Sequence, residues 1–135
     1  MKKTFTLFGL LLMCLLTFAQ NPCPQVIPAL QHWKGAKGTL ALPAQGSIVI
    51  NPQDEATLGQ TASILAEDLK ELMGWEYTIT TGKAKKNDIY LSLSQPDEQL
   101  GKEGYVLAIN NKVSIEAPTT QGVFWGTRTL LQMLY

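Results

Sequence analysis

The segment from residue 47 to residue 80 constrains the fold most, because it reads as strand, helix and strand. Ser47–Ile50 is short and β-branched, and Trp75–Thr80 alternates apolar and polar side chains, as strands do. Between them, a periodic apolar pattern predicts a helix from Asp54 to about Met73. Two strands joined through a helix run parallel, with a right-handed crossover. The sequence therefore predicts a sheet with a parallel pair and a helix packed on one face.

The predicted helix has clear ends and one apolar face. Asn51–Asp54 is a helix-entry signal, acidic Asp54 and Glu55 suit the positive end of the helix, and Gly74 suits a left-handed C-cap. Its acidic residues lie on the polar face, a spacing typical of a solvated helix rather than of a catalytic cluster. The predicted core face consists of Leu58, Ala62, Leu65, Leu69, Leu72 and Met73.

Further strands follow from alternation and from turn residues. A hairpin is predicted around Asn110-Asn111, residues that tolerate positive φ, and Pro118 ends the sheet. The element order is then β-β-α-β-β-β-β-α, which predicts an α+β fold, a two-layer sandwich of a mixed β-sheet with two helices on one face. The additional predicted strands are Thr39–Leu42, Asp88–Ser94, Glu103–Ile109 and Lys112–Ala117.

The last predicted helix, opened by Thr119 or Thr120 as its N-cap, is apolar on two faces. One face carries Val123, Thr127, Leu130 and Leu134 and is expected to dock on the sheet. Gly122 and Gly126 cost helix stability and so predict close approach of another backbone. We expect the remaining side chains to form an interface with a second partner that these residues do not supply, unless the segment around Trp33 folds over them. The predicted interface residues are Phe124, Trp125, Arg128, Leu131 and Tyr135.

The N-terminus is typical of a secretory signal peptide over residues 1–19. Lys2 and Lys3 precede an apolar run that is short for a membrane span, and Thr17-Phe18-Ala19 predicts cleavage before Gln20. Residues 20–35, which are rich in proline, are expected to form an extended lead-in, followed by a domain over residues 36–135. We expect an exported protein, periplasmic or extracellular, with no membrane contact after cleavage.

The residues offer little chemistry of their own. A formal net charge of zero argues against nucleic acid as a partner. Cys23 and His32 lie in the lead-in, where we interpret the thiol as free and not as a nucleophile, and the lysine-rich stretch 82–87 is interpreted as a solvated loop. No catalytic, cofactor-binding or metal-binding residue is predicted, and no cofactor is expected.

Several stretches together resemble the small N-terminal domain of bacterial family 20 glycoside hydrolases, the β-N-acetylhexosaminidases. Glu103–Ile109 is similar to that domain's EGY-type strand, Val113–Ala117 to its partner strand, and Gly122–Leu134 to the helix that closes the domain. Ala66–Leu69 fits more loosely, and Arg128 stands where an aliphatic or glutamine side chain is often found. The resemblance covers roughly residues 36–135.

The resemblance implies a downstream (β/α)₈ barrel that carries an Asp-Glu pair. In that family the substrate's own N-acetyl group attacks the anomeric carbon, and the glutamate protonates the leaving oxygen. The pairs Asp54-Glu55 and Asp97-Glu98 lie at a helix start and in a loop, so this chemistry is not carried over to them. We therefore expect a non-catalytic N-terminal domain, truncated before the barrel, of a secreted exo-β-N-acetylhexosaminidase. Its partner is that barrel, through which alone it meets a glycan.

Two alternatives stay open at this point. The chain can be a stand-alone binding or structural module without chemistry, or the N-terminal domain of another glycosidase such as an α-glucuronidase. The gene sequence beyond Tyr135 separates all three readings.

Overall fold

The computed structural model describes residues 20–135, so the predicted signal peptide lies outside the described residues. They divide into two compact units, the first formed by residues 20–24 and 30–39 and the second by residues 25–29 and 40–135. The first unit has no helix or strand. Asn21 holds it together, because its N–H donates to the carbonyl of Ala36 at 2.9 Å and its side chain to that of Gly38 at 2.7 Å. Every helix and strand below belongs to the second unit.

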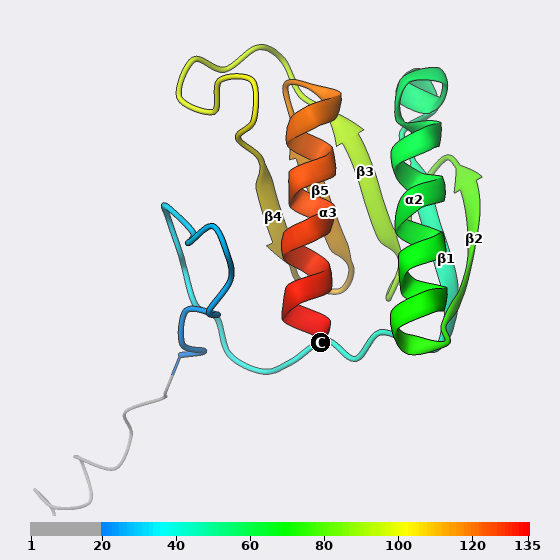
Figure 1. The fold of residues 1–135 in the computed structure, drawn as a ribbon, viewed down its shortest axis with the longest axis horizontal. Coiled ribbons are helices and arrows are strands. Elements are labelled where there is room, and N and C mark those ends of the chain that lie inside the picture. Colours follow the sequence, from blue (N-terminus) through cyan, green and yellow to red (C-terminus); the bar gives the residue numbers. More distant parts are fainter. Residues whose placement is uncertain (1–19) are drawn as a thin grey trace, which may run out of the picture. The chain divides into compact units, whose positions relative to one another are not determined.

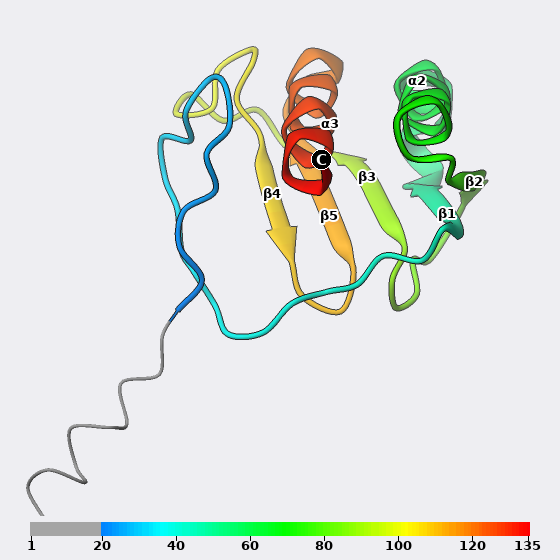
Figure 2. The ribbon, with the colours of Figure 1, turned by 60° about the horizontal axis from the view of Figure 1, so that its bottom comes forward.

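The second unit is a five-stranded mixed sheet with two helices on one face (Figures 1 and 2). The strand order is β2-β1-β3-β5-β4, with neighbouring strands parallel except for the antiparallel pair β4–β5. This arrangement confirms the predicted α+β sandwich. The strands are β1 Gln45–Ile50, β2 Glu76–Thr81, β3 Ile89–Leu93, β4 Val106–Ile109 and β5 Val113–Ala117. The helices are the short 3-10 helix η2 Pro52–Asp54, α2 Glu55–Met73 and α3 Thr120–Leu134.

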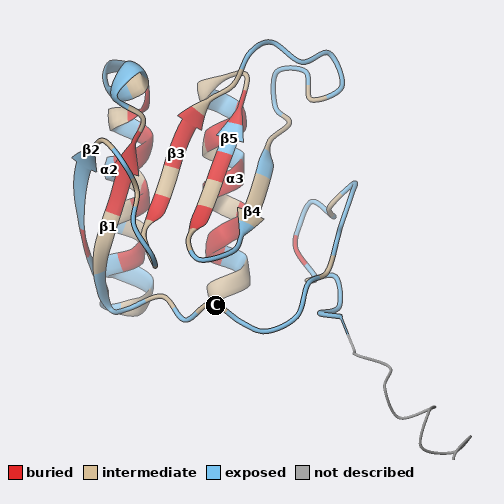
Figure 3. Cartoon of the chain, turned by 180° about the vertical axis from the view of Figure 1, so that it is seen from behind, coloured by how far each residue is buried: buried red, intermediate tan, exposed pale blue. Residues whose placement is uncertain are grey.

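The predicted crossover is confirmed, since β1 pairs with β2 in parallel through α2. In register, Ile48 of β1 lies between Ile79 of β2 and Ile89 of β3. Residues 82–88, which join β2 to β3, then pass over the face of the sheet that the helices leave uncovered (Figure 3). Both helices lie on the other face of the sheet (Figure 2), and the core lies between them and the sheet.

The predicted first strand, Thr39–Leu42, is wrong. No ladder forms over these residues, and the first strand, β1, begins at Gln45. Leu40 and Leu42 pack partly buried against the core, whereas Thr39 and Ala41 are exposed. The alternation therefore reflects which side chains are buried, while a strand also needs a neighbouring backbone to pair with. The observed order is β-α-β-β-β-β-α.

Most of the predicted core face of α2 is confirmed. Leu58, Ala62, Leu65 and Leu69 have no exposed surface, but Leu72 is 51% exposed. Leu72 lies in the last turn of α2. Periodicity gives its direction around the helix axis but not whether neighbouring elements extend that far. The prediction that Leu72 belongs to the core was therefore wrong.

The ends of both helices follow the sequence signals. Gly74 adopts φ 70° as the C-cap of α2, and the Thr119 side chain accepts a hydrogen bond from the N–H of Gly122 at 3.0 Å. A Cβ on Gly122 would lie 2.7 Å from that of Ala117 and closer still to the carbonyl oxygen of Gly104. This contact confirms the predicted close approach of another backbone. No helix within residues 20–135 is long and apolar enough to cross a membrane.

Candidate functional surface

The predicted sheet-facing side of α3 is buried except at Leu134, which is partly buried, and aromatic side chains elsewhere on the helix stay exposed. Val123, Thr127 and Leu130 are buried against the core, whereas Trp125 is 39% exposed and Tyr135 92% exposed. The rings of Phe124 and Trp125 meet edge to face, 5.6 Å apart. An aromatic surface thus remains on α3 once its core contacts are made. We call Phe124, Trp125, Arg128 and Tyr135 the α3 outer face.

Arg128 links this face to α2. Its guanidinium lies 2.6 Å from a carboxylate oxygen of Asp68, and both side chains are about one quarter exposed. The contact is an ion pair rather than a well-aligned hydrogen bond. The same guanidinium stacks over the ring of Phe124, 4.7 Å from its centroid, a cation–π arrangement. The Asp68–Arg128 pair escaped the sequence analysis, because helix periodicity does not say which residues of two helices meet.

Leu131 is placed differently from the other predicted interface residues. It is 6% exposed and belongs to the core of this chain, so it offers little surface to anything outside. Residues 25–29, part of the predicted lead-in, contact α3 in this region. The side chain of Gln132 accepts from the Ile27 N–H at 2.8 Å and donates to the Ile27 carbonyl at 2.9 Å. The chain therefore covers some of α3 itself, whereas Trp125 and Tyr135 of the α3 outer face stay exposed.

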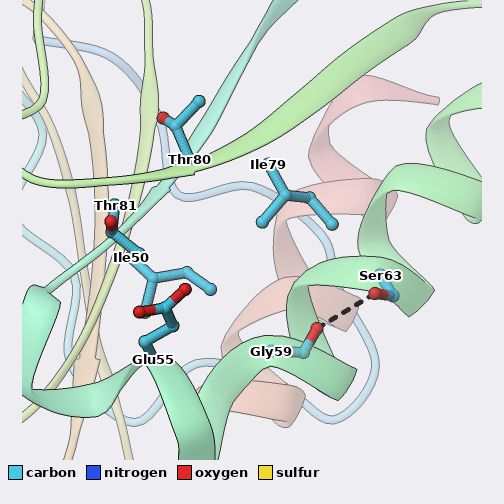
Figure 4. A pocket seen from close by; sticks show the side chains of 7 residues that line it. All are labelled: Ile50, Glu55, Gly59, Ser63, Ile79, Thr80 and Thr81. Carbon is cyan, nitrogen blue, oxygen red and sulfur yellow. Dashed lines mark hydrogen bonds between the residues drawn. The ribbon is translucent and has the colours of Figure 1, made fainter.

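Two clefts, of about 460 and 240 Å³, lie between α2 and the edge strand β2. Figure 4 shows the larger one, where Glu55 is the charged residue and the hydroxyl of Ser63 donates to the carbonyl of Gly59 at 3.1 Å. We call the two clefts together the edge groove. The larger cleft is lined by Ile50, Glu55, Gly59, Ser63, Ile79, Thr80 and Thr81. The smaller one is lined by Ala66, Glu67, Lys70, Trp75, Glu76 and Tyr77.

The edge groove was not predicted from the sequence. Two signals for it were present: a glycine inside an otherwise regular helix, Gly59, and an isoleucine, Ile79, in a strand that proved to be an edge. The side-chain period alone does not reveal these clefts, because it does not show which strand lies at the edge of the sheet.

The open face of the sheet carries polar groups. The hydroxyl of Ser92 donates to the carboxylate of Glu116 at 3.3 Å. Burial raises the pKa of Tyr90, and the nearby carboxylates of Asp54 and Glu116 add to the effect. On the helix side of β2, burial likewise raises the pKa of Tyr77, with a smaller contribution from Asp88. Both phenols therefore stay protonated near pH 7, and that of Tyr77 donates a hydrogen bond to the carbonyl of Pro43 at 2.8 Å.

The aspartates of the two acid pairs and the cysteine each have a structural partner. Asp54 accepts a hydrogen bond from the Leu93 N–H at 2.8 Å, and Asp97 accepts one from the Gln99 N–H at 2.8 Å. The thiol of Cys23 contacts the carbonyl of Pro24 at 3.7 Å, which is a weak hydrogen bond. Within residues 20–135, no group of three or more His, Cys, Asp or Glu side chains is arranged to hold a metal ion.

A family model and a curated relative each match most of this chain. The sequence model of the family described as "Glycosyl hydrolase family 20, domain 2" matches residues 23–135. A lacto-N-biosidase of Bifidobacterium bifidum is 32% identical over 113 residues, which cover 82% of this chain and 10% of that protein. The chain therefore spans about a tenth of the length of this curated relative.

Two solved structures share the fold. The GH20 β-N-acetylhexosaminidase from Streptomyces coelicolor A3(2) matches with a TM-score of 0.68 and 25% identity, over 84% of this chain and 22% of that one. A GH138 enzyme targeting pectin rhamnogalacturonan II matches with a TM-score of 0.53 and 22% identity, over 66% of this chain and 10% of that one. The second likeness concerns the fold alone.

Proposed function

The chain belongs to the family described as glycosyl hydrolase family 20, domain 2, and on this premise we propose that it is the non-catalytic N-terminal domain of an exported exo-β-N-acetylhexosaminidase. The family match over residues 23–135 carries the proposal. A solved relative described as a GH20 β-N-acetylhexosaminidase supports it, at 25% identity. The fold by itself does not select the sugar, because a GH138 enzyme shares it.

In this proposal, chemistry takes place in a catalytic barrel encoded further along the gene. That barrel supplies the Asp-Glu pair with which a terminal N-acetylhexosamine is released by substrate-assisted catalysis. The acid pairs of this chain have other tasks, since Asp54 binds the backbone of β3 and Asp97 that of a loop. Glu55 begins α2, where a carboxylate is favourable at the positive end of the helix.

The role of this chain in the longer protein is to support that barrel. The α3 outer face is the proposed contact, because Trp125 and Tyr135 expose aromatic surface that is not packed against the sheet. Exposed apolar patches usually mark interaction sites. The Asp68–Arg128 ion pair and the Arg128–Phe124 contact hold this face in a fixed geometry.

Export is part of the same proposal. Residues 1–19 have the basic start, apolar run and small residues of a secretory signal, and cleavage is expected before Gln20. N-terminal sequencing of the protein recovered from the periplasm or the medium tests this part. A product that retains Lys2 and Lys3 would contradict it.

The test of activity compares this chain with the product of the complete gene. We expect the complete product to hydrolyse an aryl N-acetyl-β-glucosaminide and this chain alone to be inactive. Glu55→Ala and Glu98→Ala serve as controls, because activity that survives both in the isolated chain would come from a contaminant. A complete product that releases only other sugars, or a gene that stops after Tyr135, would reject the proposal.

The test of docking uses Trp125→Ser combined with Tyr135→Ser in both proteins. If the α3 outer face contacts the barrel, the double variant lowers the melting temperature of the complete protein but leaves that of the isolated chain nearly unchanged. Glu67→Ala on the polar face of α2 is the matched control and should alter neither. Equal melting temperatures of the complete protein with and without the double substitution would remove the proposed interface.

A further inference from the structure

β2 forms one edge of the sheet, and the direction of its free hydrogen-bonding groups follows from two observed bonds. The N–H groups of Glu76 and Gly82 donate to carbonyls on the β1 side, at 2.8 and 3.1 Å. Successive N–H groups of a strand point to opposite sides. Those of Tyr77, Ile79 and Thr81 therefore point outward, away from β1, as do the carbonyls of the same residues.

This edge lacks the usual protection against pairing with another strand. Natural edge strands commonly carry lysine, proline or a bulge. β2 has none of these between Glu76 and Thr81, and it pairs without interruption along β1. Its central residue, Ile79, is 40% exposed. The edge is therefore a ready template for a further strand.

The edge groove beside Ile79 offers room for the side chains of such a strand. Gly59 of α2 lines the larger cleft, and a Cβ built on it would meet nothing within 4 Å. A glycine inside a helix costs about 1 kcal/mol relative to alanine. Packing within this chain gives no reason for that cost, in contrast to Gly122, whose Cβ would collide with neighbouring backbone. Gly59, which has no side chain, thus lies on the side of α2 next to the unpaired edge strand β2.

We propose that β2 pairs antiparallel with β2 of a second copy of this chain, across a two-fold axis at Ile79. In this register Ile79 faces its own copy, and Tyr77 faces Thr81 of the second copy. All three residues direct their N–H and C=O groups outward, so each facing pair exchanges two hydrogen bonds. The result is one continuous ten-stranded sheet with an isologous interface.

The charges around β2 favour a second copy as the occupant. An acid, Glu76, begins the strand, and an exposed base, Lys83, follows its end by two residues. Antiparallel pairing about Ile79 brings Glu76 opposite Gly82 of the second copy and next to its Lys83, and symmetry repeats this contact. Thr78 then lies opposite Thr80, a favourable cross-strand pair. A parallel arrangement would instead bring like charges together.

The first test is the mass of the chain in solution over a concentration series, measured by sedimentation equilibrium. We expect a reversible dimer. Ile79→Lys places two like charges on the two-fold axis, and because Ile79 is partly exposed the variant is expected to fold, as circular dichroism will verify. It should be monomeric throughout the series. A monomeric native chain, or a dimer that Ile79→Lys leaves intact, would overturn the proposal.

Charge exchange gives a second test that does not depend on the stability of one variant. Glu76→Lys alone and Lys83→Glu alone should each weaken the dimer, whereas the double variant should restore it. A loss of folding cannot produce such a rescue. Single variants that dimerise like the native chain, or a double variant weaker than both, would reject the two-fold register.

Crosslinking tests the axis itself. Facing residues of a hydrogen-bonded antiparallel pair have Cα atoms about 5.5 Å apart, within the range that a disulfide spans. In a chain with Cys14→Ser and Cys23→Ser, Ile79→Cys should form a covalent dimer under mild oxidation. Val106→Cys, an exposed residue of the opposite edge strand β4, is the matched control and should stay monomeric. Equal crosslinking of the two variants would contradict pairing through β2.

Discussion

The two helices lie on the same face of one sheet but use their glycines for opposite purposes (Figure 2). In α3, a Cβ on Gly122 would enter the backbone of residue Gly104, and one on Gly126 would strike Ile115. In α2, a Cβ on Gly59 would meet nothing. The α3 glycines let a helix sit close to the sheet and to the loop before β4. The α2 glycine keeps space open beside an edge strand.

The helices differ in their second faces as well. The side of α2 away from the core is charged, with Glu67, Lys70 and Glu71 exposed, whereas α3 exposes Trp125 and Tyr135. A polar outer face is satisfied by water, but an aromatic one gains free energy when it is covered. The comparison shows that the outer side of α2 is mainly polar, whereas that of α3 keeps aromatic side chains exposed.

The largest expected effect tests whether the core face of α2 is correctly assigned. Leu69 has no exposed surface, so Leu69→Ala should destabilise the fold by about 2–5 kcal/mol through lost burial and a residual cavity. Urea denaturation gives the free energy of unfolding. Glu67→Ala, on the polar face, should stay within about ±0.5 kcal/mol of the native chain. Equal shifts for both variants would mean that the helix is rotated from the orientation described.

The next effect concerns Gly122, the first of the two glycines in α3. Gly122→Ala should destabilise the fold by about 1–3 kcal/mol, because its Cβ meets backbone that cannot move aside cheaply. The expected cost outweighs the improved helix propensity of alanine. Thermal and urea unfolding measure the change. A stabilised Gly122→Ala variant would show that α3 has more room over the sheet than the contacts imply.

The glycine of α2 should respond with the opposite sign. Gly59→Ala adds helix propensity without a collision, so it should stabilise the fold by roughly 0.5–1 kcal/mol. The same urea measurement as for Gly122→Ala gives a direct comparison of the two helices. A destabilised Gly59→Ala variant would remove the contrast between the two glycines.

The smallest effect on stability is expected at the α3 outer face. Trp125→Ser removes a side chain that is 39% exposed, so the free energy of unfolding should change by no more than about ±0.5 kcal/mol. Solubility should nevertheless rise, because the exposed apolar patch becomes smaller. Precipitation thresholds of the two chains measure this. An unchanged threshold with a large loss of stability would mean that Trp125 serves the core of this chain.

The sequence predicted correctly those features that depend on residues close together in the chain. Gly74, Thr119 and the apolar period of α2 each act within a few residues, and the structure has the C-cap, the N-cap and the helix where the sequence placed them. The predicted strand Thr39–Leu42 was wrong because alternation indicates only that one side of a segment is buried. Leu40 and Leu42 are partly buried without a partner strand. The prediction for Leu72 was wrong because the apolar period gives the direction of a side chain around the helix axis. It does not show how far along the helix the neighbouring elements extend.

The sequence by itself determined the fold class, the parallel crossover through α2, the caps, and the existence of a second apolar face on α3, since these follow from side-chain period and backbone preference. Only the tertiary structure decided which strand lies at the edge, that Asp68 meets Arg128, that Leu131 is buried, and that Gly59 borders open space while Gly122 does not. The physical reason is that these features depend on pairs of residues far apart in the chain. The sequence around one residue of such a pair does not indicate which distant residue it contacts.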